Sequence, residues 1–171
     1  MKPRIPAAAV EANTDKESSW KPSSEEEASR RTIYAFIKRG LVVPMLEVLD
    51  LGDTVSSCPQ RQITTVAPQA LTLFNGDFVN EQAAHFAERL RKEAGPDLRS
   101  RLELAWRLAM CRPPTSSELA AMEAYWEQEV SRSITEAPAG QRELARSEAG
   151  HAALTQVCRV IFNLNEFVYP D

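Results

Sequence analysis

The sequence predicts a mainly α-helical fold, a C-terminal helical bundle of about four helices preceded by an irregular, proline-broken segment with a short strand. Apolar residues recur at helical spacing in the second half, whereas prolines and glycines interrupt the first half. The 171 residues suit one domain, 24–171, after an extended arm, 1–23. Within that domain we expect a strand and loop part at 24–67 and a helical part at 68–171. The expected long helices lie near 78–94, 97–111, 116–130 and 141–162.

The arm contains three prolines and no apolar periodicity, so we expect it to be extended and largely unpacked. Trp20 is the exception, because a large aromatic side chain in such a segment usually packs onto folded protein. Ser24 and the glutamates after it resemble a capping box, which predicts a short helix or turn at 24–29. The β-branched and aromatic residues that follow favour a strand at 31–38. The cations that flank this run could hold an anion or form a solvated rim: Arg30, Arg31, Lys38 and Arg39.

A polar cluster lies in the irregular residues 40–67. Its three carboxylates, Glu47, Asp50 and Asp53, are spaced three residues apart. Such a loop could ligate calcium through oxygen, although the pattern does not match an EF-hand. Turn formation and an ion pair with Arg61 are the structural alternative, which we favour. The candidate binding residues are therefore Arg31, Lys38, Arg39, Glu47, Asp50, Asp53 and Arg61.

The helices carry recognisable start and stop signals. Pro68 suits a first helical turn, so residues 69–74 are expected to form two turns that end at Asn75-Gly76. Thr115 and Glu118 form a capping box, the clearest helix start in the chain. Helix 97–111 has apolar residues on two sides, including Leu108 and Cys111, which predicts neighbours on both. Residues 131–140 are expected to be a linker, and the inner side of the last helix is expected to hold Leu144, His151, Leu154, Val157, Cys158 and Ile161.

No cofactor is predicted for this chain. Its three cysteines, Cys58, Cys111 and Cys158, lie in no C-x-x-C or C-x-x-C-H motif, which excludes a zinc knuckle and covalent haem. Cys111 and Cys158 fall on predicted helices, where we expect small buried side chains. His85 has no second histidine or cysteine at metal spacing, so we expect a surface or structural role and no metal site.

The net charge of −4 argues mildly against nucleic acid as a partner, because phosphate binding favours a basic face. No apolar run approaches the length of a membrane span. The N-terminus lacks the apolar centre of a signal peptide, which predicts a cytoplasmic location if the chain is expressed alone.

Five stretches together resemble one known family. They are RRTIYAFIKR, EVLDLGDTVSSCPQR, TTVAPQALTLFNGDFV, LAWRLAMCRPPTSSEL and VCRVIFNLNEFVYPD, in this order. Over roughly residues 20–171 the chain is similar to the C-terminal part of planctomycete-type proteins that join a cytochrome c-like domain to two domains of unknown function. The family is the planctomycete-specific domain, also called domain of unknown function 1553. It has no established reaction and therefore implies no catalytic residues.

The resemblance implies an exported parent protein, periplasmic or at the cell surface, with an export signal and a haem-binding motif. This chain has neither, so we expect a truncated or separately encoded tail whose partners are other domains of the parent or a partner protein. By resemblance alone, the site candidates also include Tyr34, Cys58, Thr64, Pro68, Gln69 and Asn75.

Two classes of function remain. The first, which we favour, is a non-catalytic structural or interaction module of an exported, cytochrome c-linked protein. The second is a fragment of an enzyme domain, polysaccharide-related or redox, whose catalytic parts lie upstream. Against a complete enzyme, the sequence shows no Ser-His-Asp order, phosphate loop or metal triad. Acids on a flexible loop, such as Glu47 and Asp50, are poorly held for a paired-carboxylate hydrolase.

Overall fold

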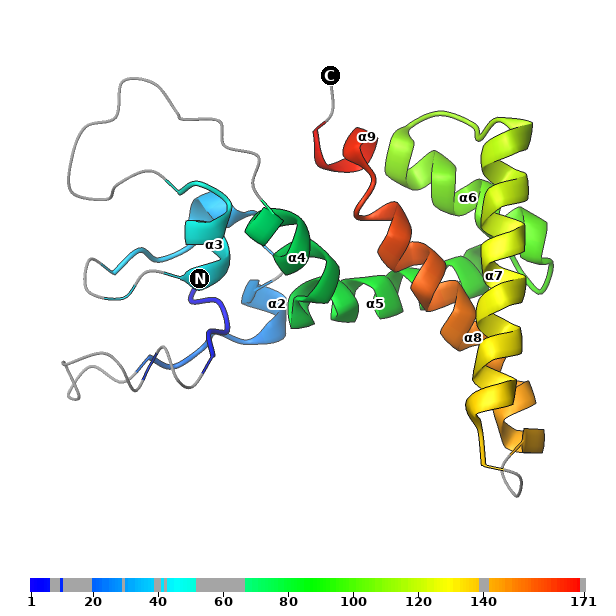
Figure 1. The fold of residues 1–171 in the computed structure, drawn as a ribbon. Coiled ribbons are helices and arrows are strands. Elements are labelled where there is room, and N and C mark those ends of the chain that lie inside the picture. Colours follow the sequence, from blue (N-terminus) through cyan, green and yellow to red (C-terminus); the bar gives the residue numbers. More distant parts are fainter. Residues whose placement is uncertain are drawn as a thin grey trace. The chain divides into compact units, whose positions relative to one another are not determined.

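The described part of the chain is mainly helical and has no strand beyond a single bridge, which confirms the expected mainly α fold (Figure 1). The chain divides into two compact units, Met1–Thr72 and Leu73–Asp171, and each has a hydrophobic cluster of its own. The computed structural model describes residues 1–6, 10, 20–28, 30–38, 41, 43–51, 67–138 and 142–169.

The second unit contains all four predicted long helices and a short one after them. The largest departure from expectation is the third helix, which continues through the predicted linker. Residues 131–136 contain neither glycine nor proline, so nothing in the sequence ends the helix before Pro138. The helices are α5 (Asp77–Glu93), α6 (Leu98–Met110), α7 (Ser116–Glu136), α8 (Arg142–Ile161) and α9 (Asn165–Val168).

Helices α6 and α7 each begin with a side-chain cap. The Asp97 carboxylate accepts the backbone N–H of Ser100 at 2.8 Å, which satisfies one of the free donors of the first turn. The predicted capping box of α7 is confirmed, because the Thr115 hydroxyl and the Glu118 carboxylate each accept the other residue's backbone N–H.

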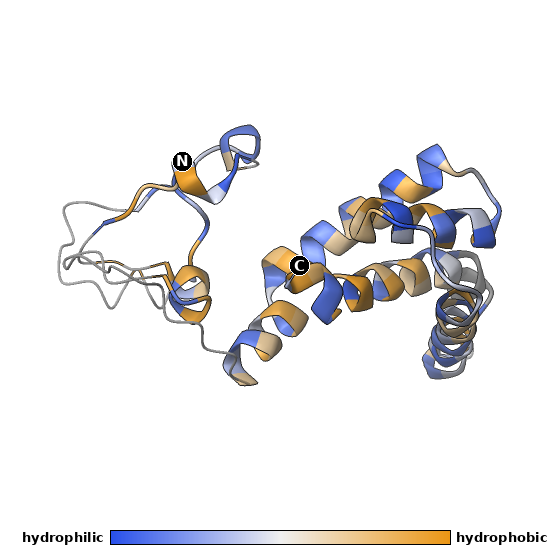
Figure 2. Ribbon diagram, turned by 90° about the horizontal axis from the view of Figure 1, so that it is seen from above, coloured by the Kyte–Doolittle hydropathy of each residue, from blue (hydrophilic) through white to orange (hydrophobic). Residues whose placement is uncertain are grey.

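Helix α8 packs against both α7 and α5, and its buried face completes the core of the second unit. Figure 2 shows hydrophobic and hydrophilic residues alternating along these helices, as expected for amphipathic helices that bury one side. On α5, Val79, Ala83 and Leu90 are all buried. The buried core residues are Ala83, Ala87, Leu90, Leu102, Ala105, Trp106, Leu119, Met122, Leu154, Val157, Cys158 and Ile161.

Three residues that were predicted to be buried are exposed. His151 is exposed, although it lies on α8 with the buried Leu154. Leu108 and Cys111 are exposed as well, whereas Leu104 on the same side of α6 is half-buried and packs against the core. The second apolar side of α6 is therefore only partly covered within the described chain.

Helices α7 and α8 are in contact at Gly150. The indole N–H of Trp126 donates a 3.0 Å hydrogen bond to the Gly150 carbonyl, in the middle of α8. A Cβ atom at this glycine would lie 3.4 Å from Cζ2 of the same tryptophan. A methyl group at this position would therefore touch the indole at about van der Waals distance, whereas a larger side chain would collide with it.

The first unit contains short helices and turns. The predicted strand at 31–38 is wrong: Thr32–Tyr34 forms a 3-10 turn, and Lys38 makes only an isolated bridge to Leu41. β-branched residues favour a strand only where a neighbouring strand supplies the ladder, and no described segment does so here. The elements are α2 (Glu25–Ala28), η1 (Thr32–Tyr34), α3 (Pro44–Val48) and α4 (Ala67–Asn75), whose last residues belong to the second unit.

The described ends of the N-terminal arm, residues 1–6 and 20–23, are packed, whereas most of residues 7–19 lie outside the described residues. Backbone hydrogen bonds join Ser23 N to Lys2 O at 2.9 Å and Phe36 N to Met1 O at 2.7 Å. The predicted docking of Trp20 is confirmed, because its ring is buried beside Leu41 and Val43. Its indole N–H also donates to the Pro3 carbonyl at 2.8 Å.

Candidate functional site

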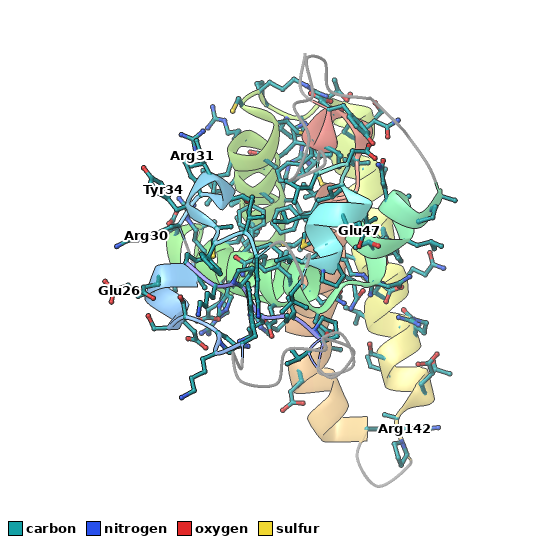
Figure 3. All side chains as sticks on the ribbon, turned by 90° about the vertical axis from the view of Figure 1, so that its left-hand side faces the viewer. Glu26, Arg30, Arg31, Tyr34, Glu47 and Arg142 are labelled. Atoms are coloured by element: carbon teal, nitrogen blue, oxygen red, sulfur yellow. The ribbon has the colours of Figure 1, made fainter. Side chains whose placement is uncertain are left out.

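The described members of the predicted polar cluster do not meet at one point. Arg31 is exposed just before η1, and Glu47 is exposed on α3. Figure 3 shows these two side chains well apart. Lys38 is half-buried at its bridge to Leu41. Arg39, Asp53 and Arg61 lie outside the described residues, as do Cys58 and Thr64.

Asp50, one of the described members of this cluster, has a defined structural contact. Its backbone is left-handed, with φ of 58°, a conformation that aspartate tolerates better than most residues. Its carboxylate accepts a 2.8 Å hydrogen bond from the side-chain amide of Gln69 on α4. Gln69 is 4% exposed, so this bond satisfies a buried polar group. The pair is consistent with the structural interpretation of the loop acids.

Among the described residues, no three His, Cys, Asp or Glu side chains are grouped closely enough to hold a metal ion. The calcium alternative requires Asp53, which lies outside the described residues, so the choice between metal and structure is left to experiment. His85 is exposed, which agrees with the predicted surface role.

A second polar site, which the sequence analysis missed, surrounds the C-terminal end of α4. The Arg159 side chain on α8 donates from Nε to the Phe74 carbonyl at 2.8 Å, and its guanidinium lies 4.2 Å from the centre of the Phe74 ring. Four residues later, just after the end of α8, the Asn163 amide donates to the Leu73 carbonyl at 3.4 Å. Two carbonyls that the end of α4 leaves free thus receive donors from the last part of α8 and the turn after it.

A third site, also missed, is centred on Arg112, directly after α6. Its guanidinium binds Glu118 through two hydrogen bonds of 3.0 and 2.7 Å and Glu166 through two of 2.7 Å. Its charge also lies 5.3 Å from the centre of the Trp106 ring. Paired fork-to-carboxylate bonds of this kind fix orientation as well as distance. Arg112 therefore joins the start of α7 to α9.

These contacts change the ionisation of the carboxyl groups. The Arg112 guanidinium, with help from the Thr115 N–H, lowers the pKa of Glu118 from 4.5 to about 2. The same guanidinium lowers the pKa of Glu166, and the two carboxylates together raise the pKa of Arg112. All three groups are therefore charged at neutral pH, as a structural clamp requires.

A fourth polar group is the buried Glu129 on α7, which pairs with Arg132 one turn later. Burial, followed by the charge of Glu129, raises the pKa of the neighbouring Tyr125. The phenol of Tyr125 is therefore protonated at neutral pH. The pairing of Glu129 with Arg132 compensates a buried charge within α7.

Of the described thiols, Cys158 is buried as expected, and Cys111 is not. Burial raises the pKa of the Cys158 thiol to about 12, so the reactive thiolate is scarce. Cys111 is exposed after the last turn of α6, with left-handed φ of 56°.

A hollow of about 340 Å³ lies at the start of α7, lined in part by Arg99, Glu103 and Arg107. Arg99 and Glu103 pair with each other at 3.3 Å. These opposite charges offset one another, and Arg107 adds a further positive charge to the lining.

The missed arginines had a signal in the sequence. Arg112 and Arg159 each lie in a stretch that carries the family resemblance, and each interrupts an apolar run. An arginine among apolar residues requires a partner for its charge. The partners, Glu166 and the end of α4, are distant in sequence and could not be chosen from spacing alone.

The protein is thus mainly helical, and the polar side chains described above bind the ends of helices or join one helix to another. The model of the family described as PSD1, protein of unknown function (DUF1553), matches residues 2–126, well over half of the 171, and the chain belongs to this family. Searches of curated proteins and of solved structures gave no match. Among the described helices, none combines the length and apolar character needed to cross a bilayer.

Proposed function

We propose that this chain is a non-catalytic interaction module at the C-terminal end of a larger exported, cytochrome c-linked protein of the planctomycete type. Its partners are other domains of that protein. Its own contribution is a binding surface, and it carries no haem of its own because it lacks the C-x-x-C-H attachment motif.

The observation that carries this function is a series of exposed apolar side chains around the end of α4. Leu71 is 61% exposed, Phe74 is 41% exposed, and Phe78 on the first turn of α5 is 54% exposed. Leu71 and Phe74 are three residues apart, so they share one face of α4. We call these three residues the α4 ridge. Exposed apolar side chains gathered in this way are typical of protein interaction surfaces.

The α4 ridge is held in position before any partner arrives. Arg159 contacts the face of the Phe74 ring and its carbonyl, and Asn163 contacts the carbonyl of the preceding residue. An aromatic side chain that is already ordered loses little conformational freedom on binding. Aromatic residues of this kind are common anchors in protein interfaces. The polar site around α4 therefore supports a binding role and not a chemical one.

The test measures binding to the rest of a family protein. The probe is a full-length cytochrome c-linked member expressed without the segment that corresponds to this chain, and calorimetry gives the affinity for the whole chain. We expect binding that Leu71→Ser with Phe78→Ser weakens by about tenfold or more, which corresponds to about 1.4 kcal/mol.

Leu108→Ser is the matched control, because Leu108 is an exposed leucine on a different helix, α6. It should bind like the wild type. Absence of binding, or equal loss in the control, would refute the proposed function. A Soret band of stoichiometric intensity in the purified chain would refute the haem part.

A further inference from the structure

A second apolar surface lies in the first unit, on the segment that was expected to be a strand. Ile33 is 84% exposed, Tyr34 62%, Phe36 49% and Ile37 47%. We call these four residues the 33–37 patch. These four residues lie within five consecutive positions, whereas the exposed apolar residues of an ordinary protein surface are scattered singly.

The backbone beneath the patch is tied down, so the exposure does not come from a loose loop end. Tyr34 N donates to the Arg31 carbonyl at 2.9 Å, and Phe36 N donates to the Met1 carbonyl at 2.7 Å. The Phe36 ring also lies 6.3 Å from the buried Trp20 ring. The contacts hold one side of the segment and leave the other side of its apolar residues in solvent.

Charges of both signs border the 33–37 patch. Arg30 and Arg31 immediately precede it and are exposed. The exposed glutamates Glu25, Glu26 and Glu27 lie on α2, just before them, and Glu25 pairs with Arg4 of the same chain at 3.2 Å. Figure 3 shows Glu26, Arg30, Tyr34 and Arg31 one after another along one edge of the view. The surface thus has an acidic end and a basic part around an apolar centre.

We propose that the 33–37 patch binds the same patch of a second copy of this chain, in a two-fold symmetric dimer. In a two-fold symmetric interface, if residue i of one copy contacts residue j of the other, then residue j of the first copy contacts residue i of the second. Residues of opposite charge can therefore face each other at two equivalent places. The glutamates of one copy would lie against Arg30 and Arg31 of the other, and the apolar centres would meet. An apolar centre with a charged rim is the usual composition of a protein interface.

The presence of both positive and negative charges around the 33–37 patch favours a second copy of the chain over other binding partners. An anionic membrane surface would attract Arg30 and Arg31 but repel the three glutamates on α2. A purely acidic partner would meet the same repulsion. Only a surface with the opposite arrangement of charges satisfies both ends, and the chain itself presents one when rotated by half a turn.

The test uses two variants of the whole chain with opposite charge changes. The acidic variant carries Arg30→Glu and Arg31→Glu, and the basic variant carries Glu26→Lys and Glu27→Lys. Sedimentation velocity reports the mass, with 19.1 kDa as the monomer. We expect the wild type to dimerise, with a dissociation constant on the order of tens of micromolar that weakens with added salt. Each variant alone should dimerise at least about tenfold more weakly.

An equimolar mixture of the two variants should recover the dimer, because each then meets its complement. Adding Tyr34→Ser to both should abolish this recovery, which separates a specific interface from simple attraction between opposite charges. Tyr169→Ser, at an exposed tyrosine outside the patch, is the matched control and should not change the mass. Circular dichroism confirms that each variant is folded.

Three outcomes would overturn the dimer: a monomeric wild type at hundreds of micromolar, a dimer that none of these variants weakens, or a mixture of charge variants that stays monomeric. Anionic vesicles added to the wild type test the membrane alternative, and binding to them without a dimer would also overturn it. Because none of these variants changes a residue of the α4 ridge, failure of the dimer prediction would leave the proposed function unaffected.

Discussion

The side-chain amide of Gln69 donates a 2.8 Å hydrogen bond to the carboxylate of Asp50, nineteen residues earlier in the chain. The bond ties the first turns of α4 to the residue pair that follows α3. Asp50 thus has two structural tasks at once: it accepts from a buried amide and it adopts a left-handed backbone.

Replacing Asp50 with alanine should therefore be more harmful than replacing it with asparagine. Alanine removes the acceptor and tolerates the left-handed backbone poorly, for a combined loss of about 2–3 kcal/mol of unfolding free energy. Asparagine tolerates that backbone and retains an oxygen, so its loss should be about 1 kcal/mol. Urea unfolding measures both, with Glu47→Gln as the exposed control. Equal losses for the two substitutions would contradict this account.

Added calcium should leave the melting temperature of the wild type unchanged if Asp50 has a structural role. A bound ion would instead raise the melting temperature by stabilising the folded state. The measurement is thermal unfolding with and without calcium, on the wild type and on the Asp50→Asn and Asp53→Asn variants. A calcium-dependent rise that disappears in either variant would revive the metal site.

The contacts of Arg112 should make stability depend on pH in the acid range. Because they lower the pKa values of Glu118 and Glu166, their contribution is complete above the ordinary value of 4.5 and is lost as pH falls toward the folded value, about 2 for Glu118. The melting temperature of the wild type should therefore fall more steeply over this range than that of Arg112→Met. Arg107→Met, at an exposed arginine on α6, should retain the wild-type slope. Parallel slopes for all three proteins would disprove the assignment.

Gly150→Ala should stabilise the protein. Alanine favours a helix interior over glycine by about 0.8–1 kcal/mol, and its Cβ would meet Trp126 at 3.4 Å, an ordinary contact distance. Gly150→Leu should destabilise, because the larger side chain would displace the indole from the carbonyl that it binds. Thermal unfolding compares the two. Destabilisation by alanine would show that the α7–α8 contact has no room for a methyl group.

The two described thiols should differ sharply in reactivity. In a Cys58→Ser background, an aromatic disulfide reagent should label the exposed Cys111 rapidly and the buried Cys158 only after unfolding. Absorbance of the released thiolate gives the count and the rate. Rapid labelling of both would show that α8 opens readily in the native state.

The helices could be predicted because their signals are local. The capping box of Thr115 with Glu118 and the apolar side of α5 depend on residues a few positions apart. The strand at 31–38 could not be excluded, since its residues favour a strand and only the lack of a neighbouring strand among the described residues decides otherwise. The contacts of Arg112 with Glu166 and of Arg159 with Phe74 join residues more than fifty positions apart, which spacing does not reveal.

The match to the family model ends at residue 126, in the middle of α7, yet the core depends on α8. Leu154, Val157, Cys158 and Ile161 are almost completely buried in the cluster that also covers α5 and α6. A protein shortened to the matched segment would expose the apolar faces of α5 and α6 that α8 covers, and it should aggregate. The segment that matches the family model is therefore shorter than the segment that folds. A shortened chain that is meant to fold should extend beyond α8.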